Sequence, residues 1–206
     1  GNVANNSGGP HCLADGVTDS HVLAIEVILP DGEIGQFGGI DPEPSGLDLR
    51  GAFIGSEGTL GITTKIAVRL TPNPEEVQTI LISFATMRKA AETVSAVIAN
   101  GIVPAAMEAM DQKTIEVIEK HIPAGYPTDV GAVLLVEVEG LPDGVENDAL
   151  QICEIAEAHE ALDIKLAQNS WQREALWKGR KSAFGASTYI APSFYLHDTV
   201  VPRSQL

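Results

Sequence analysis

The sequence predicts an α+β protein with two folded units. A glycine-rich pattern of short strands runs to about residue 70, residues 71–74 read Thr-Pro-Asn-Pro, and strands then alternate with helices. Proline lacks the donor that a strand ladder needs, so this segment marks a boundary. With 206 residues, of which 44% are hydrophobic, the chain is long enough to bury a core in each unit.

The first predicted unit is a loop-rich β region. Residues 22–29 are apolar and β-branched, a Pro-Asp-Gly-Glu turn follows at 30–33, and the strand pattern resumes at Ile34, which together predict a hairpin. Another strand is expected over residues 65–70. Thirteen of the twenty glycines lie within the first 61 residues, so this region is expected to contain many tight turns.

The second predicted unit alternates strands with helices. Strands are expected over residues 79–84, 105–110, 132–138 and 164–167. The first helix between them is expected to stop at Asn100 and Gly101, and the second to be capped by Asp111. A last helix, capped by Ser170, is expected to run to about Tyr189. This recurrence predicts a sheet with helices on one face, as in ferredoxin-like domains.

The composition excludes several classes of protein. A formal charge of −15 does not suit a nucleic-acid-binding surface, and no apolar run approaches the roughly 18 residues that cross a bilayer. Cys12 and Cys153 suggest neither a metal pair nor a disulfide framework, which is typical of a reducing compartment, so a cytoplasmic protein is expected. The chain opens without an initiator methionine or a signal peptide, which favours an internal piece of a longer protein.

Two glycine-containing runs are candidates for ligand binding. Residues 1–9 read Gly-Asn-Val-Ala-Asn-Asn-Ser-Gly-Gly, and residues 53–63 read Phe-Ile-Gly-Ser-Glu-Gly-Thr-Leu-Gly-Ile-Thr. Backbone N–H groups in such runs can wrap a polar cofactor, although the same composition also makes plain turns. A strand follows the second run where a Rossmann fingerprint requires a helix, so the order argues against a Rossmann site.

Together these runs and four further motifs carry a resemblance to a known family. The motifs are residues 2–11, 29–33, 55–62, 101–108 (Gly-Ile-Val-Pro-Ala-Ala-Met-Glu), 176–181 (Leu-Trp-Lys-Gly-Arg-Lys) and 200–204 (Val-Val-Pro-Arg-Ser). They resemble the FAD-linked oxidases of the vanillyl-alcohol oxidase or PCMH type, and within them the glycolate oxidase flavoprotein subunits and D-lactate dehydrogenases. The resemblance runs along the whole chain.

The resemblance implies a fold and a cofactor. Residues 1–72 would be the second half of a PCMH-type FAD-binding domain, and residues 73–206 an incomplete ferredoxin-like substrate (cap) domain. FAD would be bound, mainly by backbone groups, at two sets of residues: Asn2, Ala4, Asn5, Asn6 and Ser7, and Glu57, Gly58, Thr59, Leu60, Gly61, Ile62 and Thr63. Glycines suit this task because they let main-chain donors come close to the cofactor.

The resemblance also implies a reaction. A protein of this type would oxidise glycolate or a D-2-hydroxyacid such as D-lactate by hydride transfer to FAD, and partner subunits of a glycolate oxidase-like complex would be possible. No catalytic base is assigned and no metal ligand is expected, since the family's metal-binding segment would lie beyond Leu206. The five histidines show no ligand spacing. A non-enzymatic α+β module that has lost its cofactor is the alternative.

Positive charge gathers near the end of an otherwise acidic second unit. Residues 74–167 contain 17 acidic and 5 basic side chains, whereas residues 168–206 contain 2 acidic and 5 basic ones. On a helix, Arg173, Trp177, Arg180 and Phe184 would share one face, which suits a small carboxylate, although these positions can equally be core and surface. The resemblance favours Arg180 as the carboxylate ligand and Arg203 as the second choice, because a planar guanidinium can bind a carboxylate through two hydrogen bonds.

Overall fold

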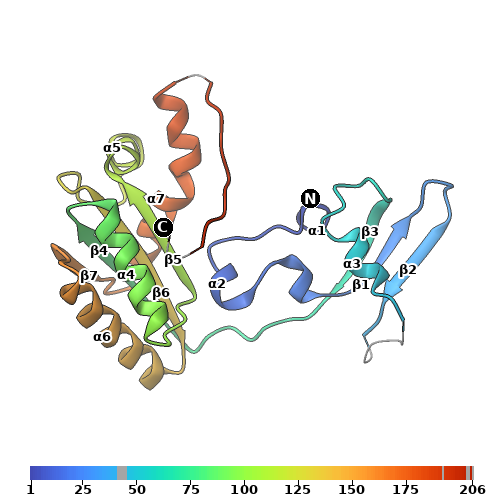
Figure 1. Cartoon of the computed structure of the whole chain (residues 1–206), viewed down its shortest axis with the longest axis horizontal. Helices are drawn as coiled ribbons and strands as arrows, with labels where there is room; N and C mark the ends of the chain where they lie inside the picture. Colours follow the sequence, from blue (N-terminus) through green and yellow to red (C-terminus); the bar gives the residue numbers. More distant parts are fainter. Residues whose placement is uncertain (41–45, 192, 203–204, 206) are drawn as a thin grey trace. The chain divides into compact units, whose positions relative to one another are not determined.

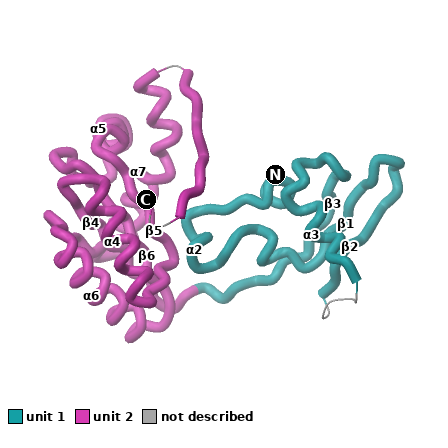
Figure 2. Tube along the Cα trace, in the orientation of Figure 1, with its two compact units in different colours: residues 1–73 teal, residues 74–206 magenta. Residues whose placement is uncertain are grey.

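The computed structural model describes residues 1–40, 46–191, 193–202 and 205. The chain divides into two compact units, Gly1–Asn73 (unit 1) and Pro74–Leu206 (unit 2), coloured separately in Figure 2. The division falls within the Thr-Pro-Asn-Pro segment. Each unit has its own sheet, so the two are described in turn.

Unit 1 is built on a three-stranded antiparallel sheet in the order β2-β1-β3. Its strands are β1 (Val22–Ile28), β2 (Ile34–Gly38) and β3 (Ile62–Val68). The predicted hairpin is confirmed, because β1 pairs with β2 from Ile28 opposite Ile34 to Ala24 opposite Gly38. The third strand starts three residues before the expected position and pairs along the other side of β1.

Short helices complete unit 1. They are α1 (Asn2–Asn5), α2 (Cys12–Asp15), the 3-10 turn η1 (Thr18–His21) and α3 (Leu49–Phe53). Residues from α1, β1 and α3 form the core of the unit: Val3, Val22, Ile25, Val27, Phe53 and Ile54. The Asp48 side chain caps α3 by accepting a hydrogen bond of 3.0 Å from Gly51 N–H. The core therefore joins the beginning of the chain to the segment that precedes β3.

Unit 2 contains a four-stranded antiparallel sheet in the order β5-β6-β4-β7. Its strands are β4 (Glu76–Phe84), β5 (Ala106–Asp111), β6 (Ala132–Gly140) and β7 (Asp163–Leu166). This is the strand order of a ferredoxin-like fold, so that prediction is confirmed. The two central strands are buried along most of their length, which explains their continuous apolar sequences.

Helices cover both faces of this sheet, whereas the sequence pattern predicts one covered face (Figure 1). The helices are α4 (Met87–Ala99), α5 (Gln112–His121), α6 (Pro142–Ala158) and α7 (Ser170–Ala186), followed by the 3-10 turn η2 (Ser187–Tyr189). One apolar cluster packs α4 and α6 on the sheet, and a second packs α5 and α7 on the opposite face. The one-face prediction was wrong because the helical spacing shows that α5 and α7 exist but not that they pack on the face opposite α4 and α6.

The helix ends in unit 2 follow local chemistry. As predicted, Asp111 caps α5, accepting from Thr114 N–H at 2.9 Å, and α4 ends at Asn100 before Gly101, whose φ is +84°. The cap of α7 is Asn169, which accepts from Gln172 N–H at 3.0 Å. Ser170, expected to be that cap, is instead the first helical residue. No helix in the described part of the chain is long and apolar enough to cross a membrane.

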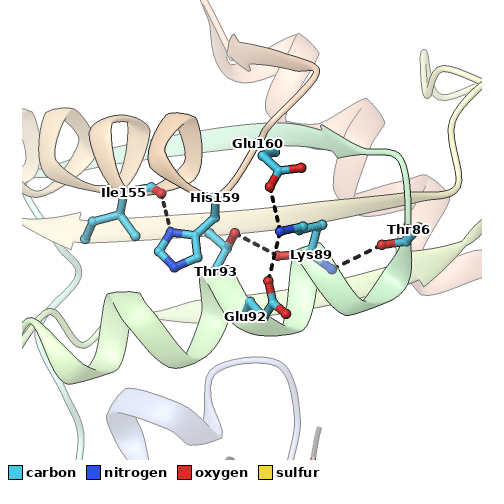
Figure 3. A network of polar contacts seen from close by, with 7 residues as sticks. All are labelled: Thr86, Lys89, Glu92, Thr93, Ile155, His159 and Glu160. Atoms are coloured by element: carbon cyan, nitrogen blue, oxygen red, sulfur yellow. Dashed lines mark hydrogen bonds and ion pairs between the residues drawn. The ribbon is translucent and has the colours of Figure 1, made fainter.

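A polar network ties the start of α4 to the end of α6 (Figure 3). The Lys89 ammonium lies 2.8 Å from Glu160 Oε1 and 3.3 Å from Glu92 Oε2. His159 Nδ1 lies 2.8 Å from the Ile155 carbonyl oxygen. The Lys89 pairs raise the pKa of its ammonium above the ordinary value. Because the two carboxylates that pair with Lys89 are exposed, the network orients two helix ends and adds little stability.

Candidate functional site

Unit 1 brings together the two glycine-containing runs that the sequence singles out. Gly55 N–H donates to the Val3 carbonyl at 2.9 Å, and Glu57 N–H donates to the Ala4 carbonyl at 2.8 Å. Val3 is buried in the core of the unit together with Phe53 and Ile54, the first two residues of the second run. About fifty residues of sequence thus separate two segments that are adjacent in space.

These two segments hold an unusual backbone conformation. Five of their residues have positive φ: Asn6 (47°), Gly55 (80°), Glu57 (53°), Gly58 (78°) and Gly61 (159°). A left-handed glutamate is uncommon, since only glycine and, less often, asparagine adopt this region at low cost. A Cβ atom on Gly58 would meet no atom within 4 Å. Gly58 therefore presents an exposed, bare backbone that another group can approach closely.

Other predicted FAD-binding residues have structural tasks. Asn6 Oδ1 accepts from Asp19 N–H at 2.9 Å, and the Ser7 carbonyl accepts from Thr18 N–H at 3.1 Å, so both hold the following turn. Thr59 Oγ1 donates to the Ser56 carbonyl at 2.7 Å. The side chains of Asn2 and Asn5 are exposed on α1.

The end of the second run belongs to the sheet. Ile62 and Thr63 begin β3, and Leu60 before them is exposed. A Cβ on Gly61 would lie 2.7 Å from the carbonyl oxygen of Ile28, so this glycine lets β3 approach β1. The structure therefore gathers residues 2–7 with Glu57 and Gly58, whereas residues 61–63 extend away along a strand. Their assignment to the cofactor stays a prediction.

The gathered segments fit a polar cofactor. Within the described part of the chain, no protein acceptor binds the Gly58 N–H, and open space lies over that glycine. The two runs contain mainly small and amide side chains, and Glu57 is their one ionised side chain. Free backbone donors next to a glycine without a Cβ neighbour are what a phosphate or ribityl chain requires. Asn2, Asn5, Gly58 and their neighbours are thus the residues of this chain that would hold FAD.

In unit 2, Arg180 lies on α7 and is bound by Glu108, a strand residue that was not among the predicted site residues. Its Nε and Nη2 donate to Glu108 Oε2 at 2.9 Å and 2.6 Å. Glu108 lies on the same face of β5 as the buried residues Ala106 and Met110, which is the sheet face that α7 covers. A glutamate at a core-facing position of a strand was the signal available in the sequence, because such a carboxylate requires a partner.

The face of α7 that was expected to bind a carboxylate makes mainly contacts within the protein. Trp177 is buried, and its Nε1 donates to Glu137 Oε2 at 2.5 Å. Arg173 reaches the Val77 carbonyl at 3.4 Å, and Phe184 packs edge-on against Phe194. Arg180 is therefore the one residue of the predicted four that combines partial exposure with an ion pair. Arg203, the second predicted carboxylate ligand, lies outside the described residues.

Close helix packing places Arg180. A Cβ on the neighbouring Gly179 would lie 2.5 Å from Ala124 Cβ and 2.7 Å from Tyr126 Cε2, so only glycine fits where α7 crosses this loop. The buried Tyr126 hydroxyl donates to the Leu176 carbonyl. Burial raises the pKa of the Tyr126 phenol above its ordinary value, so it stays protonated and keeps donating.

Comparison with known proteins identifies the family. Residues 73–206 match the family described as FAD linked oxidases, C-terminal domain. The chain belongs to the FAD-linked oxidases. FAD is the cofactor of this family, which confirms the resemblance and the cofactor that the motifs predict.

Relatives of known name match the chain along its whole length. Glycolate oxidase subunit GlcD of Escherichia coli (strain K12) is 42% identical over 206 residues, which are 100% of this chain and 41% of that protein. D-lactate dehydrogenase of Anaerostipes hadrus is 30% identical over 217 residues, covering 100% of this chain and 45% of that protein. The chain thus spans less than half the length of the curated relatives it matches.

Solved structures confirm the predicted fold class. Alkyldihydroxyacetonephosphate synthase has a TM-score of 0.69 at 17% identity, over 88% of this chain and 38% of that one. p-Cresol methylhydroxylase with bound substrate has a TM-score of 0.60 at 15% identity, over 76% of this chain and 37% of that one. The second protein is the PCMH after which this fold type is named.

Proposed function

We propose that the complete protein containing this chain is an FAD-dependent dehydrogenase or oxidase of glycolate or of a D-2-hydroxyacid such as D-lactate. Membership of the FAD-linked oxidases supports this, together with relatives named for glycolate and D-lactate. The observation that carries the proposal is the joining of residues 2–7 to Gly55 and Glu57 by two backbone hydrogen bonds. These bonds assemble a cofactor-binding surface from distant segments.

Each unit has its own task in this proposal. Bound FAD supplies the acceptor for the substrate's hydride. In unit 1, backbone donors around Gly58 hold the polar part of the cofactor, and the absence of a side chain there allows the close approach. In unit 2, Arg180 provides a fixed positive charge for the substrate carboxylate, which orients the α-carbon.

Two matched glycine variants test cofactor binding. Gly58 and Gly32 both have positive φ, 78° and 88°, and a Cβ on either would meet no atom within 4 Å. Valine therefore introduces comparable backbone strain at both positions, but only Gly58 lies in the FAD-binding segment. We expect Gly58→Val to abolish flavin absorbance in the purified complete protein and Gly32→Val to retain it. Equal flavin content in both variants contradicts the assignment, and a wild-type protein without flavin favours the non-enzymatic alternative.

The carboxylate assignment is tested by replacing each predicted arginine with lysine. Arg180→Lys keeps the charge and loses the planar fork, so kcat/KM for the best hydroxyacid should fall roughly 30- to 1000-fold, which corresponds to about 2 to 4 kcal/mol. FAD content and the melting temperature should stay unchanged. If Arg203→Lys is the damaging variant, the carboxylate role belongs to Arg203. If neither variant lowers kcat/KM, neither arginine binds the substrate carboxylate.

Partner subunits follow from the same proposal. The Escherichia coli relative is named as a subunit of glycolate oxidase. We expect the complete protein to co-purify with further subunits of a glycolate oxidase-like complex when it is expressed with them. A cytoplasmic location stays a prediction.

A further inference from the structure

The guanidinium of Arg180 has two edges, and the described residues of the chain occupy one of them. Nε and Nη2 both donate to the same Glu108 oxygen, which occupies the side-on edge. A guanidinium has five N–H donors, so both hydrogens of Nη1 and the second hydrogen of Nη2 remain for another acceptor. One of the Nη1 hydrogens and the second Nη2 hydrogen point the same way and form the end-on edge, which matches the two oxygens of a carboxylate.

Arg180 borders a surface hollow. It lines this hollow with Met87, Met110, Thr114 and Ala183. Asp111 also lines it, but its Oδ1 accepts from Thr114 N–H as the cap of α5. The Arg180 side chain is about one-third exposed and that of Glu108 is about one-fifth exposed, so water still reaches the pair.

The elements that carry the pair are themselves fixed. Glu108 lies in β5 and pairs with Leu135 of β6. Arg180 follows Gly179, and the close contact of Gly179 with Ala124 fixes the distance between α7 and this loop. An arginine side chain has many rotamers, and an unpaired one would have to be ordered when a ligand binds. The carboxylate of Glu108 provides that order in advance.

We propose that Glu108 is the positioning residue for substrate binding: it holds the Nε and Nη2 edge of Arg180, so that the end-on edge is presented to the carboxylate of a small hydroxyacid in this hollow. The inference rests on the proposed function and adds a residue to it. Glu108 does not touch the substrate. Its effect passes through the orientation of one guanidinium.

A double-mutant cycle tests the inference in the complete, FAD-loaded protein. We would measure kcat and KM for glycolate and D-lactate, with a dye as electron acceptor, in the wild type, Glu108→Ala, Arg180→Ala and the double variant. Glu108→Ala should raise KM, roughly up to 100-fold, because the guanidinium loses its orientation. In the Arg180→Ala background the same change should alter KM by no more than about 2-fold.

Two further variants separate orientation from charge and from folding. Glu108→Gln keeps an oxygen that accepts from Nε, so its KM should stay close to wild type. Glu116→Ala removes an exposed carboxylate from α5 and controls for the loss of negative charge. If Glu108→Ala does not fold, Glu108→Asp replaces it, and KM should rise because the shorter side chain withdraws the oxygen.

The outcomes distinguish this inference from the proposed function. If Arg180→Ala raises KM and Glu108→Ala or Glu108→Asp does not, the positioning role is overturned while the proposed function stands. It is also overturned if Glu108→Ala has the same effect in both backgrounds, or if Glu108→Gln is as damaging as Glu108→Ala. A wild-type protein that turns over no hydroxyacid overturns the proposed function and this inference with it.

Discussion

Units 1 and 2 are stabilised in different ways. In unit 2 the sheet lies between two apolar clusters, and β6 is buried from Ala132 to Val138. Unit 1 has a single cluster of six buried residues, and Ile28, Ile34 and Ile62 pair across its sheet while 40%, 66% and 67% exposed. Burial of side chains therefore contributes far more to unit 2 than to unit 1.

Unit 1 relies instead on backbone conformation. In its described part nine residues have positive φ, against four in the described part of unit 2, although unit 1 is the shorter. Seven of the nine are glycines. Substitutions should accordingly damage unit 2 mainly by disturbing its packed core and unit 1 mainly through backbone strain.

The largest effect is expected in the core of unit 2. Ile152 on α6 is 0% exposed, so Ile152→Ala should cost about 2 to 5 kcal/mol of unfolding free energy through lost burial and the cavity it leaves. Leu150 on the same helix is 59% exposed, and Leu150→Ala is the matched control, with a change below about 0.5 kcal/mol. Urea denaturation followed by circular dichroism measures both. Equal losses would mean that α6 is not held by its buried face.

The corresponding change in unit 1 acts on a glycine. Gly38 ends β2 with φ of 80°, and a Cβ there would overlap the carbonyl oxygen of Leu23. Gly38→Ala should cost about 2 to 4 kcal/mol, combining left-handed strain with the clash. Gly32→Ala, with φ of 88° and open space, should cost only about 1 kcal/mol. If both variants unfold at the same urea concentration, close backbone approach does not limit unit 1.

Two glycines on α7 should respond with opposite signs. Gly179→Ala inserts a methyl group against Ala124 and Tyr126 and should destabilise unit 2 by about 1 to 3 kcal/mol. A Cβ on Gly185 would meet nothing within 4 Å, so Gly185→Ala should stabilise the helix by about 0.5 to 1 kcal/mol. Thermal unfolding distinguishes them. Stabilisation by both alanines would show that α7 does not pack tightly where it carries Arg180.

The fold of unit 2 could be predicted from its sequence because its signals are local. Asp111 caps the helix that follows it, and Gly101 ends the helix that precedes it. The face on which each helix packs depends on contacts between distant segments, so the pattern missed the second covered face. In unit 1, α3 has five residues, too few to show a helical period, and its existence depends on burying Phe53.

The candidate site shows the same limit. The two runs of unit 1 could be selected by composition, yet only the structure shows that Gly55 meets Val3. Arg180 could be selected by charge and resemblance, but its partner Glu108 is 72 residues away in sequence. The spacing of residues within one helix or strand carries no information about an ion pair between two distant elements. The face of β5 on which Glu108 lies is the local signal that would have indicated a partner.

The unfolding free energy of unit 2 should also depend on pH through a buried tyrosine. The raised pKa of buried Tyr126 keeps its phenol protonated in the folded state where the unfolded chain ionises, so unit 2 should lose stability as the pH rises above about 10. Tyr126→Phe should cost about 1 kcal/mol at neutral pH, from the lost bond to Leu176, and reduce the alkaline loss. Tyr195→Phe, at an exposed position, is the control. Unfolding free energies at neutral and alkaline pH test this, and an unchanged alkaline slope in Tyr126→Phe contradicts it.

The smallest effect compares one left-handed glutamate from each unit. Glu57 has φ of 53° and Glu160 has φ of 66°, and glycine relieves such strain, so each Glu→Gly change should stabilise its unit by at most about 1 kcal/mol. Glu160→Gly also removes the exposed contact with Lys89, which subtracts little because water screens it. If the strain at Glu57 serves cofactor binding, Glu57→Gly should lower flavin content while raising the melting temperature, and Glu160→Gly should raise the melting temperature alone. Unchanged flavin content in both variants would make Glu57 an ordinary turn residue, and the functional part of unit 1 would then narrow to Gly58 and the α1 segment.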